Sequence, residues 1–100
     1  MTIKSPFMPQ RGANQVVSPG AVSASASVTA ACKSVRLTNA GTNICHVRIG
    51  EGAQTATTAD TPVLPGSALI LQKQMGDDTV AYISASGTTL HIQTGEGGYV

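Results

Sequence analysis

Short segments of alternating small apolar and polar residues, each bounded by turn-forming residues, run through most of this sequence. In the clearest of them serines alternate with Val22, Ala24, Ala26 and Val28. A two-residue period places successive side chains on opposite faces of an extended strand. No window has the 3.6-residue period of an amphipathic helix, although residues 53–60 have room for one helical turn. The pattern therefore predicts an all-β protein.

Further strands are predicted wherever the alternation resumes after a turn signal. Their ranges are 34–38, 44–49, 68–72, 80–84 and 88–94. Asn39-Ala40-Gly41 supplies residues that tolerate positive φ, so the strands on either side of it are expected to form a β-hairpin. Leu64-Pro65-Gly66-Ser67 has proline and glycine where a type II turn needs them. Short strands at regular spacing favour a small antiparallel β-sandwich or jelly-roll-like barrel formed by residues 21–100 as a single domain.

The same alternation predicts which side chains form the core. Val35 and Leu37 are expected to point inward from their strand. In the next strand Cys45, Val47 and Ile49 share an apolar face, and His46 and Arg48 occupy the opposite one.

The first twenty residues lack this alternation. Prolines interrupt the segment and push the residues before them toward extended geometry. Residues 1–20 are therefore expected to form an extended N-terminal arm and no packed element. Ile3, Phe7 and Met8 are its apolar residues, and we expect them to anchor the arm on a neighbouring subunit. A disordered tail is the alternative interpretation.

The composition offers little material for a large core. Aromatic residues make up 3% of the chain, charged residues 11%, and the formal net charge is +1. A small domain with few large apolar side chains has a thin stability margin, which disulfides, metals or neighbouring subunits usually supplement. Weak charge limits self-repulsion, and the sequence has no basic cluster that would neutralise phosphates. We therefore expect a homo-oligomer that does not bind nucleic acid.

The two cysteines, Cys32 and Cys45, are expected to be free thiols. The sequence shows no secretory signal, and no apolar run is long enough to cross a membrane. A reducing cytosol is the expected site of synthesis, and no membrane partner is expected. Cys45 belongs to an apolar face and is expected in the core.

Chemical sites are weakly indicated. His46 and His91 each begin the frame His-x-x-x-Gly-Glu-Gly, which also contains Glu51 and Glu96. These four side chains could bind a metal if the two strands were neighbours. The simpler interpretation is two strands with outward histidines, each ending at a glycine-bounded turn. Cys45 and His46 are adjacent on a strand and point to opposite faces, which argues against a nucleophile–base pair. We expect no enzyme activity, metal or cofactor.

Several segments, taken together, resemble a known class of protein. They are the strand and turn 35–43, the strand 46–50, the loop 59–67 with its Asp-x-Pro-x-x-Pro-Gly pattern, the strand 80–84 and the ending 90–97. In this order they resemble small virion proteins of tailed bacteriophages. The resemblance implies a capsid decoration or cement protein that binds the major capsid protein and stabilises the head. A head–tail connector, tail or fibre-associated subunit, bound to other virion proteins, is the alternative. The implied location is the virion, assembled in the host cytoplasm.

Two contact regions follow from this interpretation. The arm would dock on a neighbour by strand addition or groove packing. The small-residue strand with Val22, Ala24, Ala26 and Val28 would permit close contact between subunits. A carbohydrate-binding module is a further alternative, but such sites usually present exposed aromatic rings and this chain has few.

Overall fold

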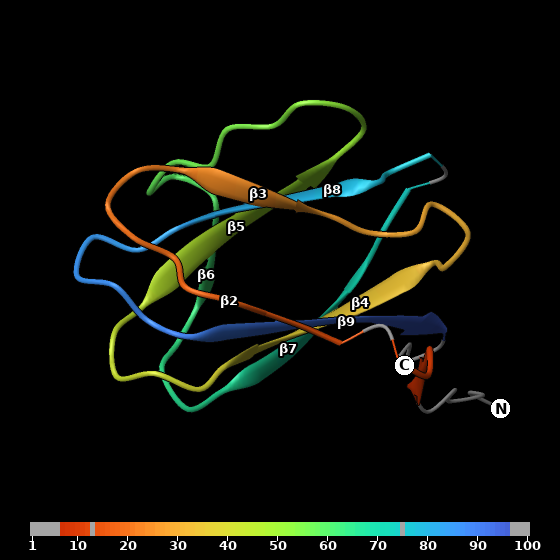
Figure 1. Cartoon of the computed structure of the whole chain (residues 1–100), viewed down its shortest axis with the longest axis horizontal. Helices are drawn as coiled ribbons and strands as arrows, with labels where there is room; N and C mark the ends of the chain where they lie inside the picture. The colour runs from red at the N-terminus through yellow and green to blue at the C-terminus, as the bar shows by residue number, and fades with distance from the viewer. Residues whose placement is uncertain (1–6, 13, 75, 97–100) are drawn as a thin grey trace, which may run out of the picture.

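The computed structural model describes residues 7–12, 14–74 and 76–96 of the chain, and these residues form two antiparallel β-sheets (Figure 1). The strands are β1 (Met8–Pro9), β2 (Gln15–Val17), β3 (Ala24–Ser27), β4 (Ser34–Asn39), β5 (Cys45–Gly50), β6 (Thr61–Val63), β7 (Ala68–Gln72), β8 (Thr79–Ile83) and β9 (Leu90–Glu96). The described residues contain no helix, so the all-β prediction is confirmed. In particular, no helix of membrane-spanning length and hydropathy is found among them.

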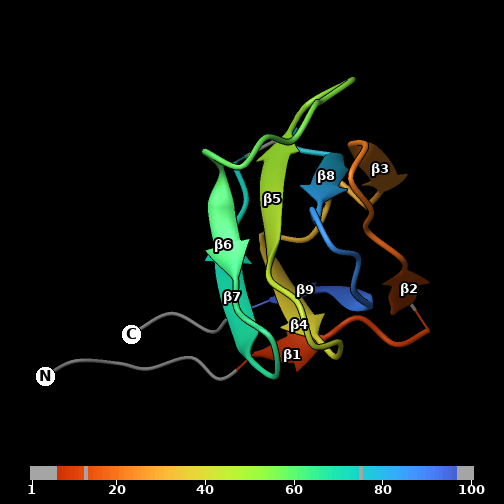
Figure 2. The same cartoon turned by 90° about the vertical axis from the view of Figure 1, so that its left-hand side faces the viewer.

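The first sheet has the order β1-β9-β4-β7, and β2 also pairs with β9. The second sheet has the order β3-β8-β5-β6. Figure 2 shows the β2 and β3 edges of the two sheets on one side of the molecule and the β6 and β7 edges on the other. Apart from β1 to β2 and β5 to β6, every connection crosses from one sheet to the other.

One hydrophobic core lies between the sheets. The first sheet contributes Val35 and Leu37 from β4 and Leu90 and Ile92 from β9. The second contributes Cys45 and Val47 from β5, Val63 from β6, and Val80 and Tyr82 from β8. The predicted inward residues of β4 and β5 are therefore confirmed, with Ile49 only half-buried. On the opposite face of β5, His46 is half-buried and Arg48 is exposed, again as predicted.

The predicted hairpin of β4 with β5 is wrong. β4 pairs with β7 and β9, whereas β5 pairs with β6 and β8 in the other sheet. Neither Asn39 nor Gly41 adopts the positive φ that a tight two-residue hairpin turn requires. The connection instead carries the chain across the core, so that β4 and β5 cover the core from opposite sides. A turn signal marks where the chain changes direction and does not identify the strand with which the next strand pairs.

The N-terminal segment also differs from expectation. β1 pairs with Gly95 and Glu96, and β2 pairs with residues 90–92, so both lie along the same edge of β9. Val17 packs against the core. The prediction that residues 1–20 contain no packed element is therefore wrong for these two strands. They are too short to show a sequence period, and only the ladder of β9 aligns them.

Other local predictions agree with the structure to within a few residues. Gly66 has a φ of 74°, and the Ser67 amide donates to the Leu64 carbonyl at 3.1 Å, as a type II turn requires.

The sequence patterns do not predict β6, because Pro62 argues against a strand. Proline is nevertheless acceptable on an edge strand, which is the position that β6 occupies. No helix forms within 53–60, where the Asp60 amide donates to the Thr57 carbonyl at 3.0 Å and closes a single turn.

Candidate interaction surface

β3 is an outermost strand of the second sheet and exposes its outer edge. It pairs on one side with β8, and the hydrogen bond from the Val28 amide to the Asp78 carbonyl (2.8 Å) fixes the alternation of the ladder. Residues that pair across an antiparallel ladder alternate between bonded and non-bonded positions. Ser25 and Ser27 therefore direct their backbone groups away from β8. The Ser25 backbone groups are open to a partner at this edge, whereas the outward Ser27 carbonyl already accepts from the Gln15 side chain.

β2 lies beside this edge on the same side of the molecule (Figure 2). The side-chain amide of Gln15 donates to the Ser27 carbonyl at 2.7 Å and so joins the two sheets along this side. Val16 on β2 is 60% exposed, and Val22, just before β3, is 83% exposed. We call Val16, Val22, Ala24, Ser25 and Ser27 the edge surface.

The four predicted contact residues of this segment divide into two pairs. Val22 and Ala24 are exposed and belong to the edge surface. Ala26 and Val28 are half-buried and pack against the core. By alternation Ala24, Ala26 and Val28 share one face of the strand, and the core covers that face only from Ala26 onward, so Val22 and Ala24 remain accessible to a partner.

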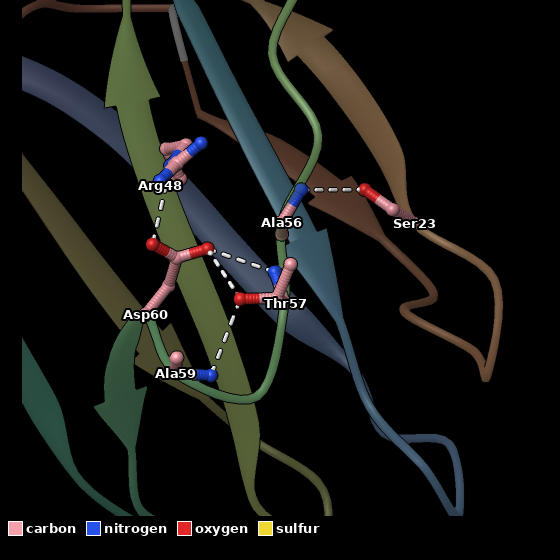
Figure 3. Close-up of polar contacts among 6 residues, drawn as sticks. All are labelled: Ser23, Arg48, Ala56, Thr57, Ala59 and Asp60. Atoms are coloured by element: carbon pink, nitrogen blue, oxygen red, sulfur yellow. Dashed lines mark hydrogen bonds and ion pairs between the residues drawn. The ribbon is translucent and has the colours of Figure 1, made fainter.

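The loop of residues 51–60, which we call the strap, extends from β5 to β6 and is attached to Ser23, between Val22 and Ala24 of the edge surface (Figure 3). The Ala56 amide donates to the Ser23 hydroxyl at 2.8 Å, next to Val22. Ala56 is buried although most of the strap is exposed. Ala81 of β8 is also buried, and it points to the outer face because Val80 and Tyr82 point into the core. The strap therefore covers part of the outer face of the second sheet.

The other end of the strap is fixed by one carboxylate. Asp60 accepts hydrogen bonds from the Thr57 amide (2.8 Å) and the Thr57 hydroxyl (3.4 Å), and it pairs with the Arg48 Nε at 3.1 Å (Figure 3). The Thr57 amide and the Arg48 charge lower the pKa of Asp60 below its ordinary value. An exposed ion pair of this kind contributes little stability, so its main effect is to hold the strap in one geometry.

A second carboxylate fixes the start of the strap. Asp78 accepts hydrogen bonds from the Gly52 amide and the Thr79 hydroxyl, both at 3.0 Å, and these bonds lower its pKa. Nearby, the buried Lys73 donates from Nζ to the Asp77 carbonyl at 2.9 Å. The Gly52–Asp78 contact ties the β7–β8 turn to the strap.

The repeated histidine frame does not bring its members together. His46 lies on β5 of the second sheet and His91 on β9 of the first, so the two strands are not neighbours. The His91 ring nitrogen Nδ1 lies 3.3 Å from the side-chain nitrogen Nδ2 of Asn14, and the Glu96 carboxylate accepts from the backbone amide of Lys33 at 3.2 Å. Within the described ranges, no three His, Cys, Asp or Glu side chains cluster as a metal site would need.

Both cysteines are free. Cys45 is buried in the core, and desolvation raises the pKa of its thiol. The half-buried Cys32 has its sulfur 3.7 Å from Oε1 of Gln10. As predicted, Cys45 and the adjacent His46 occupy opposite faces of β5, so they do not form a nucleophile–base pair.

The three predicted arm anchors differ in where they lie. The Phe7 ring is half-buried, with the Arg36 guanidinium 5.2 Å from its centroid, a distance typical of a cation–π contact within the chain. Met8 lies in β1. Ile3 falls outside the described residues. The Phe7 ring therefore makes a contact within its own subunit.

Sequence reasoning missed Val16 and the strap as parts of this surface. The Ser23–Ala56 contact joins positions 33 residues apart, and no local pattern encodes such a distance. The short apolar pair Val16-Val17 near Pro19 was the available signal for β2.

No protein-family model matches the chain, and no curated protein matches it either.

Proposed function

We propose that this protein is a structural component of a bacteriophage particle, a capsid decoration or cement protein with a jelly-roll β-sandwich fold. The strand order is the observation that carries the proposal. If β1 and β2 are counted as one interrupted strand, the first sheet has the order 1-8-3-6 and the second the order 2-7-4-5. Nearly every connection crosses the core. This order supports a jelly roll, an architecture used by viral capsid and lectin domains.

The edge surface is the region we assign to the capsid contact. Its two exposed valines, Val16 and Val22, lie among small and hydroxyl-bearing residues, so a partner backbone can approach closely. The strap supplies a second, polar part of the contact beside Val22. The contact is small, and many copies on one lattice would supply avidity that a single copy lacks.

The arm remains part of the proposal through residues 1–6. Because β1 pairs with β9, a truncation that tests the arm should end before Phe7 and leave the edge of the first sheet intact. We expect removal of residues 1–6 to weaken binding to heads. Unchanged head binding would remove the arm from the mechanism.

Copy number in purified particles is the primary test. Quantitative mass spectrometry of gradient-purified phage particles from the genome that encodes this chain should find it at hundreds of copies per particle. A handful of copies would favour the connector, tail or fibre-associated alternative. Absence from the particles would refute a virion role altogether.

A pair of aspartate substitutions tests the edge surface directly. Val16→Asp with Val22→Asp places carboxylates in the proposed contact, and desolvating them should reduce binding to heads that lack the protein by about tenfold or more. Ile44→Asp is the matched control, because Ile44 is 40% exposed and lies outside the edge surface. Co-sedimentation with heads measures the bound fraction. Equal binding by all three proteins would exclude the edge surface as the contact.

A further inference from the structure

The four sheet edges formed by the described residues differ in how they discourage strand addition. β6 contains Pro62, and β1 contains Pro9 and is separated from β2 by a turn. β3 is four residues long, and Gln15 occupies the outward carbonyl of Ser27. Natural proteins use prolines, interruptions, short strands and charges to protect edges in this way.

β7 has none of these features. Its five residues, Ala-Leu-Ile-Leu-Gln, include no proline, glycine or charge and form one uninterrupted strand at the end of the first sheet. Ile70 is 38% exposed, and Leu64, in the turn that leads into β7, is 57% exposed. An edge of this length and hydropathy is suited to pairing with another strand.

The β4–β7 ladder defines which backbone groups β7 presents. The Lys73 amide donates to the Lys33 carbonyl at 2.6 Å, and the Asn39 amide donates to the Ser67 carbonyl at 2.9 Å. Every second residue of β7 between these bonds, namely Leu69 and Leu71, therefore exchanges hydrogen bonds with β4. The backbone groups of Ala68, Ile70 and Gln72 point to the outer edge.

The outward backbone groups of β7 can bond to the same groups of a second copy that is related by a two-fold rotation. If two copies pair antiparallel about Ile70, Ile70 meets Ile70 of the other copy and Ala68 meets Gln72, which allows about six backbone hydrogen bonds. Leu69 then lies opposite Leu71 on the core side. No charged side chain lies within β7, so the pairing opposes no like charges.

We propose that β7 is a self-association edge, through which two copies of this chain pair antiparallel about Ile70 and form one continuous sheet. This inference goes beyond the proposed function and does not depend on it. The β6–β7 side lies opposite the β2–β3 side (Figure 2), so a dimer leaves both edge surfaces accessible to other partners.

The size of the contact determines its strength. A five-residue edge with two exposed apolar side chains buries much less than the roughly 1,600 Å² of a standard interface. The dimer is therefore expected to be weak in dilute solution. High local concentration on a larger assembly would favour it.

Sedimentation velocity of the full chain, from low to high micromolar concentration, tests the proposal. We expect a concentration-dependent shift from monomer to dimer that Ile70→Lys abolishes. Ile44→Lys, at a site of nearly equal exposure outside the strands, should dimerise like the unaltered chain. Gln72→Pro removes an outward N–H and no bond to β4, so it gives a second disrupting variant should Ile70→Lys fail to fold. A monomer at all concentrations, or dimers unaffected by both edge variants, would overturn the proposal.

Cross-linking tests the register. The Ile70 positions of two copies would have Cα atoms about 5.5 Å apart, within the range that a disulfide spans. In a Cys32→Ser background, Ile70→Cys should oxidise to a covalent dimer, and Ile44→Cys should not. Equal cross-linking at both sites, or none at Ile70 under conditions where the chain is dimeric, would exclude pairing about Ile70.

Discussion

Replacing Asn39 with alanine should strongly destabilise this protein, because the side chain joins the two sheets. The Asn39 side chain is completely buried at the end of β4. Its amide nitrogen donates to the Asn43 carbonyl (2.8 Å) and the Val63 carbonyl (2.9 Å). Its oxygen accepts from the Thr88 hydroxyl (2.7 Å) and the Gly41 amide (3.1 Å). The side chain thus uses its full bonding capacity to join the two sheets and two loops.

The magnitude follows from the groups that lose a partner. A buried carbonyl left without a donor costs about 1–3 kcal/mol, and the Val63 carbonyl is the more deeply buried of the two. The groups nearer the surface recover part of their bonding with water. We therefore expect Asn39→Ala to lower the free energy of unfolding by about 3 kcal/mol, a large share of the 5–15 kcal/mol typical of a domain. The melting temperature should fall by about 15 °C.

Urea denaturation followed by circular dichroism measures this change, and an unaltered m-value would place the effect on stability. Asn43→Ala is the matched control. The Asn43 amide donates to the Gly87 carbonyl at 2.8 Å, but the residue is only half-buried, so we expect a loss of about 1 kcal/mol or less. If Asn39→Ala costs no more than Asn43→Ala, the buried amide does not join the sheets as argued.

Three further outcomes are expected. Gly41→Ala should lower the free energy of unfolding by about 2 kcal/mol or more, because its Cβ would lie 2.8 Å from a backbone nitrogen of the β8–β9 connection. Gly20→Ala is the control in the same urea assay. Its Cβ would meet no atom within 4 Å, so the stability of this variant should be nearly unchanged. Because the pKa of Asp60 is depressed in the folded protein, its contribution to stability is present above the ordinary aspartate pKa of about 4 and is lost as pH falls through the folded value. Asp60→Asn should therefore flatten the decline of melting temperature between neutral and strongly acidic pH. An unchanged slope would contradict this role of Asp60. An aromatic disulfide reagent should label Cys32 in the native protein but Cys45 only on unfolding, and rapid labelling of both would contradict the core assignment.

Local sequence patterns predicted the strands well where a period of several residues was available. The range 68–72 agrees with β7, and the inward positions of β4 and β5 are confirmed. β1, β2 and β6 were missed because two or three residues cannot display a period, and each is held by pairing with a longer strand. Of the interaction residues, the alternation identified Val22 and Ala24 but could not distinguish them from Ala26 and Val28, which pack on the core.

Patterns of near neighbours along the chain are enough to predict an all-β protein, the position of most strands and the inward side chains of β4 and β5, because these properties follow from the two-residue alternation of a strand. Long-range packing places β4 and β5 in different sheets, brings the strap to Ser23 and leaves β7 at the end of a sheet, and no local pattern predicts these features. The physical reason is that backbone hydrogen bonds are the same for every strand, so strand order is set by the way all the apolar faces close around one core.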